Sequence, residues 1–561
     1  MGYIIYGINR VARDFIYIFK NLEIHYIVDN GIECDEIWGI KCFDISKLDI
    51  ESITDKIIIC DFDNLYKINY LKDRGLVFEQ DFVLAEDFFE SLDNITIPNN
   101  KGVAVWGTGN MSQKLMRECI NFSPDIFIDS NKRGEYFEGR KVYLPEEVDL
   151  KKYFIVVAVA KASQIYCKLE EIGMKEGDNY CSFQVILGRP SELLRRTIFD
   201  QSNFELECHT MLNHLEILNN GATRCCCTTF VEQDMDNILS GSLDEVWKSN
   251  IHRIMCLSIE NKTYSFCDKT MCPLFVDKMK FKGKISEIPN WEYREMEDKP
   301  SVIAVGYDPS CNLACSTCRT HTHFSKGKEK ERIDKITEKV ISEYIKNCRF
   351  MILAGDGEVF ASQAYRDVYE NENCNPSYIR LLTNGTLFTP QNWKIFKRNK
   401  TSKIMMTVSI DAATEETYSQ IRRNGNFEKL KSNMEFASKL RKEGELSYLR
   451  FNFVVQKKNY LEIIPFIQWG EKLGVDEIFF TKILNWGTYS NEEFRDISMM
   501  QDDGVTPKKE LLNILDSPIV RESKIVDLGT IQYSHKIDDV DIVENYYVWE
   551  LEKRGGHIFD K

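Results

Sequence analysis

Residues 1–192 contain one strand–turn–helix unit that is written twice. The first copy opens MGYIIYGINRVARDF and the second opens KGVAVWGTGNMSQKL. Gly7 and Asp29 of the first copy recur at Gly107 and Asp129 of the second. In each copy apolar strands alternate with helices, and this alternation predicts parallel sheets covered by helices on both faces. The chain is therefore expected to be an α/β protein with two related parallel-sheet domains.

The glycine turns of the two copies carry part of a dinucleotide-binding pattern. The acidic residue follows the first glycine at near the ~20-residue spacing of such units, where it would accept a ribose hydroxyl. The second copy has the better set, Gly107, Gly109 and Asp129, although Ser112 stands where a third glycine belongs. The copies resemble the Rossmann-like domains that accompany bacterial surface-sugar biosynthesis enzymes, some of which bind nucleotide sugars. A Rossmann-like domain without bound nucleotide is the alternative.

The 18 cysteines of the chain are the unusual part of its composition. No apolar stretch reaches the ~18 residues of a membrane span, and no basic region precedes a long apolar stretch at the N-terminus. We therefore expect a cytoplasmic protein without a membrane partner, in which thiols stay reduced and clustered cysteines point to metal ligands. The net charge of −15 argues against a nucleic-acid partner.

The segment SVIAVGYDPSCNLACSTCRTH places Cys311, Cys315 and Cys318 at C-x3-C-x2-C spacing behind a predicted strand. Three thiolates on one loop can hold three irons of a [4Fe–4S] cluster and leave the fourth iron open. Zinc would need a fourth ligand. The spacing resembles the defining motif of the radical S-adenosylmethionine (SAM) enzymes. That resemblance implies a SAM-binding cluster and cleavage of SAM to a 5′-deoxyadenosyl radical.

The following 180 residues repeat a strand–helix pattern with the secondary motifs of the same family in order. Strands ending in FMILAGDGE, YIRLLTNG and KIMMTVSID, and two further strands, complete the partial (β/α)6 barrel that the resemblance implies. In parallel barrels, functional side chains gather at the carboxyl ends of the strands. The resemblance assigns SAM contacts to seven residues at these ends: Gly355, Gly357, Glu358, Asn384, Ser409, Asp411 and Arg422.

A second set of cysteines occupies residues 208–272. It resembles the auxiliary-cluster region called SPASM, or its smaller twitch form, although in that group the region follows the barrel. The resemblance implies at least one auxiliary [4Fe–4S] cluster, whose four ligands are expected to be Cys208, Cys226, Cys267 and Cys272. The alternative ligands are Cys225, Cys227 and Cys256. A zinc site or a set of reduced cysteines is the alternative to a cluster.

These patterns divide the chain into five predicted segments. The segments are the Rossmann-like repeats at 1–98 and 99–192, an auxiliary iron–sulfur region at 193–298, a radical SAM barrel at 299–492 and a tail at 493–561. Ser242 and Glu245 stand at capping-box spacing and predict one helix through GSLDEVWKSNIHRIM. An amphipathic helix is predicted in VENYYVWELEKRGG near the C-terminus.

The resemblance implies an oxidoreductase-type radical SAM enzyme that abstracts hydrogen from its substrate. Its N-terminal repeats favour a small polyol, a sugar or a nucleotide sugar, which the enzyme would oxidise or epimerise. A reductant such as flavodoxin or ferredoxin would supply the electron. The first alternative is a peptide-modifying enzyme that acts on a ribosomal peptide or matures a protein. The second is a non-catalytic iron–sulfur sensor of a nucleotide.

Overall fold

The computed structural model describes most of residues 2–531. The positions outside the description within that range are 33–34, 94–97, 99, 120–121, 131–133, 160–162, 176, 200–207, 209, 232, 269–271, 273–274, 276–297, 399, 485–488, 490, 502–503 and 505. The contacts divide the chain into two units, residues 1–202 with 253–265 and residues 203–252 with 266–561. The five predicted segment boundaries stay a prediction. Within the described residues, no helix combines the length and the apolar character that a membrane crossing needs.

The first unit contains two six-stranded sheets. The strands of the first sheet are β1 (Tyr3–Tyr6), β2 (Ile24–Asp29), β3 (Glu36–Ile37), β4 (Ile40–Asp44), β5 (Lys56–Ile59) and β6 (Phe82–Leu84). Those of the second sheet are β7 (Gly102–Trp106), β8 (Ile126–Ile128), β9 (Tyr136–Phe137), β10 (Arg140–Tyr143), β11 (Tyr153–Val157) and β12 (Tyr180–Ser182). The helices of this unit include α1 (Arg10–Ile18), α2 (Leu65–Lys72), α3 (Asn110–Glu118), α4 (Ser163–Glu171), α5 (Phe183–Leu187) and α6 (Pro190–Phe199).

The two sheets have the same strand order. The first runs β3-β4-β2-β1-β5-β6 and the second β9-β10-β8-β7-β11-β12. Only the short hairpins β3–β4 and β9–β10 pair antiparallel within these sheets. Without the hairpin strands, each sheet has the order 3-2-1-4-5, which matches five of the six strands in the 3-2-1-4-5-6 order of doubly wound α/β sheets. The repeat in the sequence is therefore also a repeat in the strand topology.

The second unit is built around a nine-stranded sheet with the order β14-β13-β15-β16-β17-β18-β19-β20-β21. Its strands are β13 (His214–Ile217), β14 (Thr223–Arg224), β15 (Val302–Val305), β16 (Phe350–Leu353), β17 (Tyr378–Thr383), β18 (Lys403–Ser409), β19 (Tyr448–Val455), β20 (Glu477–Lys482) and β21 (Val526–Asp527). All neighbours pair parallel except β13 with β14. The six strands predicted from the sequence are β15–β20, so the α/β fold class is confirmed. Two strands that the sequence did not predict, β13 and β21, extend the parallel run at its two ends.

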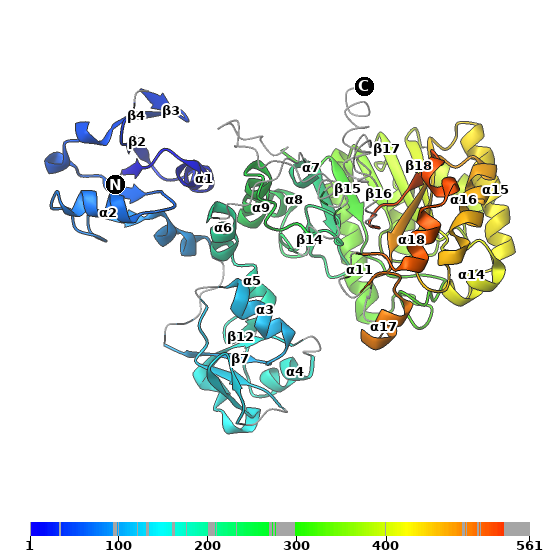
Figure 1. Cartoon of the computed structure of the whole chain (residues 1–561), viewed down its shortest axis with the longest axis horizontal. Helices are drawn as coiled ribbons and strands as arrows, with labels where there is room; N and C mark the ends of the chain where they lie inside the picture. The colour runs from blue at the N-terminus through cyan, green and yellow to red at the C-terminus, as the bar shows by residue number, and fades with distance from the viewer. Residues whose placement is uncertain are drawn as a thin grey trace. The chain divides into compact units, whose positions relative to one another are not determined.

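Helices alternate with the strands of the large sheet and cover one of its faces. The α-helices assigned from residue 210 onward are α7 (Thr210–Asn213), α8 (Leu243–Trp247), α9 (Asn250–Glu260), α11 (Gly327–Lys339), α12 (Gln363–Glu370), α13 (Pro390–Lys397), α14 (Glu415–Ile421), α15 (Phe427–Lys442), α16 (Ile463–Leu473), α17 (Asn491–Ile497), α18 (Lys509–Leu515) and α19 (Pro518–Glu522). Helices α14, α15 and α16 flank the strands in Figure 1. The rings of Phe451, Phe453 and Phe480 pack against Phe466 of α16.

The other face of the large sheet carries the alternate side chains of the same strands. Near β15 this inner face carries the buried apolar cluster of Ala304, Ile352 and Met405. The buried side chain of Arg380 lies in the same row, between Ile352 and Met405. Arg450 and Glu477 follow on β19 and β20. The inner face thus combines apolar side chains with three buried charged ones, Arg380, Arg450 and Glu477.

The helix predicted from residue 242 is interrupted. Its capping box is present, since Glu245 Oε2 accepts the Ser242 N–H at 2.7 Å. However, α8 ends at Trp247, and α9 begins at Asn250 with the Ser249 hydroxyl oxygen accepting the His252 N–H. The prediction of one helix is wrong because Ser249 caps a second one. The predicted helix in residues 543–556 lies outside the described residues.

Candidate functional site

Cys311, Cys315 and Cys318 lie on the loop that follows β15, at the carboxyl edge of the large sheet. Cys311 and Cys315 are each 8% exposed, whereas Cys318 is exposed. Burial raises the pKa of the Cys311 thiol to about 11, although the Leu313 N–H at 3.5 Å from the sulfur opposes this rise. This thiol therefore keeps its proton until a cation takes the proton's place.

The backbone of this cysteine loop is held by neighbouring segments. Cys311 exchanges two backbone hydrogen bonds with His323, at 2.7 and 3.3 Å. The N–H groups of Ala314 and Ser316 donate to the carbonyls of Arg423 and Ile421, at 3.1 and 2.9 Å. The segment behind α14 thus supports the loop between its cysteines.

Asp308 anchors the start of the same loop. Its Oδ1 accepts the N–H and the hydroxyl of Ser310, at 3.0 and 2.8 Å, and the Ser325 hydroxyl at 2.8 Å. Its Oδ2 accepts the Ser362 hydroxyl at 2.6 Å, and Ser362 in turn caps α12. Asp308 is 3% exposed, so one buried carboxylate ties the cysteine loop to the start of α12.

Each of the three cysteine sulfurs lies within hydrogen-bonding distance of a side-chain N–H. The donor to the first sulfur is Asn384 at 3.8 Å, the donor to the second is Arg422 at 3.5 Å, and the donor to the third is Arg319 at 3.3 Å. Asn384 follows β17 and Arg422 ends α14, so separate elements converge on the loop. Two of the three donors are cationic.

The glycine turn that follows β16 packs against the backbone at the start of the cysteine loop. Gly357 has φ +77°, and a Cβ on it would lie 2.2 Å from the carbonyl oxygen of Asp308. A side chain at this position would push the loop away. At Gly355 the nearest atoms lie at 3.6 Å or more from such a Cβ, the first being Oε1 of Glu216. Gly357 thus lets the cysteine loop pack closely against the turn, whereas Gly355 has open space beside it.

Glu358 turns its carboxylate into the protein. The carboxylate accepts hydrogen bonds from the Thr383 hydroxyl at 2.7 Å, the Asn384 N–H at 2.7 Å and the Phe360 N–H at 3.3 Å. Burial raises its pKa to about 6, which these hydrogen bonds partly offset. Glu358 therefore joins the end of β16 to the end of β17.

Asp411 and Arg422 form a buried ion pair at the end of β18. The Arg422 Nη2 atom lies 2.6 Å from Asp411 Oδ2, and Asp411 Oδ1 accepts the Val454 N–H at 2.8 Å. Asp411 has φ +66°, a strained angle for a residue other than glycine, of the kind that concentrates at functional sites. Burial raises the pKa of Asp411, and the Arg422 guanidinium opposes the rise. Ser409, two residues earlier, is half-buried.

Sequence reasoning missed several residues of this site. Glu216 on β13 holds the Thr228 N–H at 2.8 Å with Oε2 and places Oε1 beside Gly355. It lies next to the cysteine loop because β13 pairs parallel with β15. Asp308, Arg319 and Arg423 were missed too. The position of Arg319 directly after the third cysteine, Cys318, could have indicated a cation beside the cluster.

Residues 308–459 match the family described as the Radical SAM superfamily. The chain carries a radical SAM domain. The match confirms the predicted radical SAM domain, which belongs to a superfamily that uses a [4Fe–4S] cluster and SAM. It begins at Asp308 and ends at Asn459, which donates to the Asp411 carbonyl at 2.9 Å. The matched segment therefore contains all seven predicted SAM contacts and the three cysteines.

Several solved structures are similar to the chain at low identity. SuiB of Streptococcus suis bound to S-adenosylmethionine is 15% identical, with a TM-score of 0.28 over 41% of this chain and 49% of that one. The native anSMEcpe with bound AdoMet is 20% identical, with a TM-score of 0.25 over 33% of this chain and 51% of that one. TYW1 with a lysine–pyruvate adduct is 15% identical, with a TM-score of 0.26 over 37% and 69%. The matched region spans 40–49% of the SuiB chains. No curated protein matches the chain at a significant level.

The radical SAM domain offers donors that suit an iron–sulfur cluster. Three thiols on one loop can give three iron bonds, and N–H groups around them can support the negative charge of thiolates and sulfides. Across the described residues, no three potential ligands are already gathered as a metal-binding group. The assignment of Cys311, Cys315 and Cys318 as cluster ligands therefore stays a proposal based on their chemistry and surroundings.

Three of the four predicted auxiliary ligands, Cys226, Cys267 and Cys272, lie on two neighbouring segments of the second unit. Val231 and Cys267 pair antiparallel, and the Asp268 N–H donates to the Phe230 carbonyl at 2.7 Å. Cys272 follows on the same segment, its N–H donating to the Asp268 carbonyl at 2.9 Å. The segment that contains Cys225, Cys226 and Cys227 leads into Val231. Cys208, Cys225, Cys226 and Cys272 are buried, whereas Cys227 and Cys267 are partly exposed.

Two of the alternative auxiliary ligands have distinct surroundings. Burial raises the pKa of Cys227 to about 12, and the neighbouring Glu216 carboxylate adds to the rise. Cys256 lies on α9, in the part of that helix that belongs to the first unit. The ligand set itself stays a prediction.

The predicted nucleotide site lies at the carboxyl edge of the second sheet. Gly107 has φ +122°, and a Cβ there would meet the Ala158 carbonyl oxygen at 2.6 Å. Gly109 caps α3 with open space around it, while the Thr108 hydroxyl donates to Asp129 at 2.7 Å. The geometry suits close backbone approach, and nucleotide binding stays a prediction.

The corresponding edge of the first sheet is filled by its own side chains. Asp29 accepts the Ile8 N–H at 2.8 Å and lies 3.2 Å from the ammonium group of Lys67. Lys67 also pairs with Asp61 at 2.7 Å and is 4% exposed. The second copy is therefore the better candidate for a nucleotide, as the sequence also predicts.

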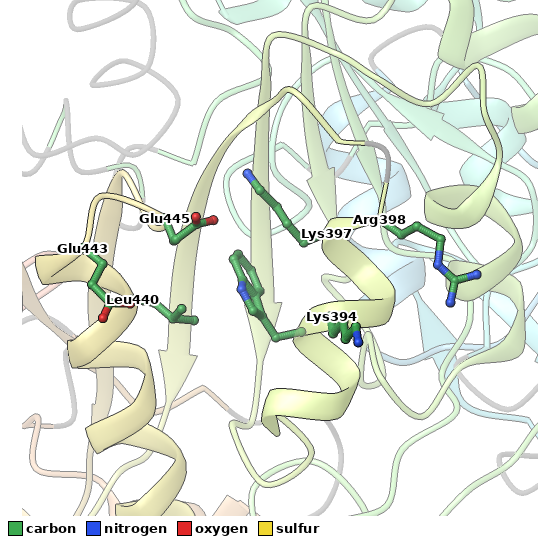
Figure 2. A pocket seen from close by; sticks show the side chains of 7 residues that line it. Lys394, Lys397, Arg398, Leu440, Glu443 and Glu445 are labelled. Atoms are coloured by element: carbon green, nitrogen blue, oxygen red, sulfur yellow. The ribbon is translucent and has the colours of Figure 1, made fainter.

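A pocket of about 530 Å³ lies between α13 and α15 and contains none of the predicted site residues (Figure 2). Lys394, Lys397 and Arg398 line it from α13 and its C-terminal end. Glu443 and Glu445 line it from the end of α15. The pocket therefore has mixed charge and is separate from the radical SAM site.

Proposed function

We propose that the protein is a radical SAM enzyme whose cluster is held by Cys311, Cys315 and Cys318. When bound and reduced, the cluster supplies one electron that cleaves SAM to methionine and a 5′-deoxyadenosyl radical, which abstracts a hydrogen atom from the substrate. The observation that carries this proposal is the cysteine loop inside the matched domain. On that loop three thiols are each approached by a side-chain N–H.

The predicted SAM contacts are proposed to have two kinds of role. Gly355 has open space beside it and Ser409 is half-buried, so we assign both to the surface that receives SAM. Asn384 and Arg422 lie between the sulfurs and the strand ends, and we place them beside the cofactor. Three others are assigned to positioning, because Glu358 and Asp411 bond to neighbouring strands and Gly357 makes room for the loop.

We propose a small polyol, a sugar or a nucleotide sugar as the substrate. The polar part of the inner face supports this class. Arg450 lies 3.5 Å from Glu477 and donates to Asn452 at 3.0 Å, and Tyr448 donates to Glu477. The buried hydroxyl of Thr407 has no hydrogen-bond partner within the described part of the chain. Such a face offers donors and acceptors to a substrate rich in hydroxyl groups.

We further propose an auxiliary [4Fe–4S] cluster on Cys208, Cys226, Cys267 and Cys272. It would accept an electron from the substrate radical, giving net oxidation. Its support is the pairing of the two cysteine segments. A flavodoxin or ferredoxin is the proposed source of the first electron.

Anaerobic reconstitution followed by dithionite reduction and chromatography for 5′-deoxyadenosine tests the reaction. The wild type should form this product from SAM, and a variant with Cys311→Ala, Cys315→Ala and Cys318→Ala should not. Equal amounts from the two proteins would refute the proposed enzyme. The same triple variant should retain iron and sulfide at the auxiliary site, and an iron content near zero would refute that second cluster.

The substrate class is tested by the stimulation of 5′-deoxyadenosine formation. Deuterated polyols, sugars and nucleotide sugars are offered beside short peptides, and deuterium is measured in the 5′-deoxyadenosine. Transfer from a hydroxyl-rich compound supports the proposed class. Transfer from a peptide alone would replace it with the peptide-modifying alternative.

A further inference from the structure

Two of the three side chains that direct N–H groups at the sulfurs of the cysteine loop are arginines, whereas the third, Asn384, is neutral. Arg319 Nε lies 3.3 Å from the Cys318 sulfur, and Arg422 Nη1 lies 3.5 Å from the Cys315 sulfur. A hydrogen bond from a charged donor is about twice as strong as one between neutral groups. The loop thus receives two cationic donors at two of its three sulfurs.

Both arginines are held in place by bonds that do not involve sulfur. Arg319 Nη1 donates to the Pro309 carbonyl at 2.5 Å, and its Nη2 lies 3.1 Å from Asp356 Oδ1. Arg422 lies 2.6 Å from Asp411. Because these partners fix each guanidinium, the N–H groups stay directed at the sulfurs rather than sampling many rotamers.

A third arginine supports the same loop without touching sulfur in the described contacts. Arg423 donates from Nε to the Ala314 carbonyl and from Nη2 to the Arg319 carbonyl, each at 2.7 Å. Arg423 therefore stabilises the loop as Arg319 does, but its N–H groups donate to backbone carbonyl oxygens and not to sulfur. This difference provides a matched comparison.

We propose that Arg319 and Arg422 set the reduction potential of the cluster bound by the cysteine loop. The inference rests on the proposed ligation of that cluster by Cys311, Cys315 and Cys318. Reduction adds one electron and makes the cluster more negative. Positive charge and N–H donors at the sulfurs stabilise the reduced form more than the oxidised form. The two arginines therefore raise the potential and make the cluster easier for its reductant to reduce.

Arg319 is the better position for a test. Removing Arg422 would leave the buried carboxylate of Asp411 without its cation, which costs stability as well as changing the potential. Arg319 pairs with the more exposed Asp356, which water can solvate when the guanidinium is gone. Its side chain is 16% exposed.

The experiment compares the full-length variants Arg319→Gln and Arg423→Gln with the wild type after anaerobic reconstitution. Each protein is titrated with dithionite under a redox mediator, and the reduced SAM-binding cluster is followed by electron paramagnetic resonance. Its signal is identified by its change on addition of SAM. For Arg319→Gln we expect a tenfold less favourable reduction equilibrium, a shift of about −59 mV for one electron. Arg423→Gln should keep the wild-type potential, even if it binds less iron.

Two results would overturn the proposal. One is an unchanged potential in Arg319→Gln, and the other is an equal shift in both variants, which would indicate a general effect of loosening the loop. If Arg319→Gln does not bind the cluster, Arg319→Lys decides instead. It keeps the charge but not the planar donor, so its potential should fall below that of the wild type. These outcomes are separate from those of the proposed reaction, which fails if the wild type forms no more 5′-deoxyadenosine than the Cys311→Ala, Cys315→Ala, Cys318→Ala variant.

Discussion

The two glycines of the turn behind β16 give the sharpest test of how the radical SAM site is built. Gly357→Ala places a methyl group 2.2 Å from the Asp308 carbonyl oxygen and 2.8 Å from that of Ser310. The backbone of residues 308–310 must retreat by about 1 Å to restore ordinary contact. The alanine also adopts φ near +77°, which costs about 1–2 kcal/mol. With about 1–3 kcal/mol for the overlap, the total is about 2–5 kcal/mol.

The expected consequence is a loss of cluster binding. The displaced segment leads directly into Cys311, so we expect Gly357→Ala to lose, after anaerobic reconstitution, most of the iron and sulfide that the Cys311→Ala, Cys315→Ala, Cys318→Ala variant also lacks. The thermal unfolding midpoint of Gly357→Ala should also fall. Both quantities can be measured without any substrate, by iron and sulfide analysis and by differential scanning calorimetry.

Gly355→Ala is the matched control. Gly355 is outside the left-handed region, and its nearest neighbours lie at 3.6 Å or more from the position that the alanine methyl group would take. We expect a stability within about 0.5 kcal/mol of the wild type and a normal iron content. Because the methyl group enters the space beside Glu216, SAM should bind less tightly in calorimetric titration. Wild-type iron content in Gly357→Ala, or equal losses in both variants, would refute this explanation of the turn.

Three further predictions concern the side chains that hold the site. Asp308→Ala leaves the Ser310 N–H without its buried acceptor and should cost about 3 kcal/mol in urea unfolding, whereas Asp308→Asn, which keeps one carbonyl oxygen, should cost about 1 kcal/mol. Glu358 has a pKa of about 6 against an ordinary value of 4.5, so between these pH values the folded chain keeps a proton that the unfolded chain has lost. Stability should therefore fall by about 2 kcal/mol as the pH rises through that window, and Glu358→Gln should remove the slope; an unchanged slope would contradict the assignment. Glu216→Gln should weaken SAM binding in calorimetric titration while leaving the iron content unchanged, and a parallel loss of iron would show that Glu216 supports the fold instead.

The parts of the structure that follow from local pattern were predictable. The strands β15–β20 are apolar runs bounded by helices, and the paired glycine turns of the N-terminal repeats recur at fixed spacing. The positions of functional side chains at strand ends followed from the same pattern. The directions in which these side chains point did not follow from the sequence pattern. Glu358 and Asp411 stand where the sequence places cofactor contacts, yet both carboxylates turn to neighbouring strands.

What the sequence could not supply depends on pairing between distant segments. Strand β13 has four residues, HLEI, and nothing in such a short run indicates that its partner begins at Val302. Without that pairing, Glu216 cannot be placed beside Gly355. Asp308 and Arg319 were hidden for a similar reason, because each acts through bonds to segments 37–54 residues away.

The pairing of β13 with β15 also limits how this protein can be divided. A fragment that begins at residue 299 would leave the N–H and carbonyl groups of β15 exposed on one side, and such unpaired edges recruit other strands and promote aggregation. It would also lack the carboxylate of Glu216. The smallest fragment that can preserve the barrel must therefore begin before His214. A fusion of the radical SAM domain to a different N-terminal segment would therefore have to include residues 214–217.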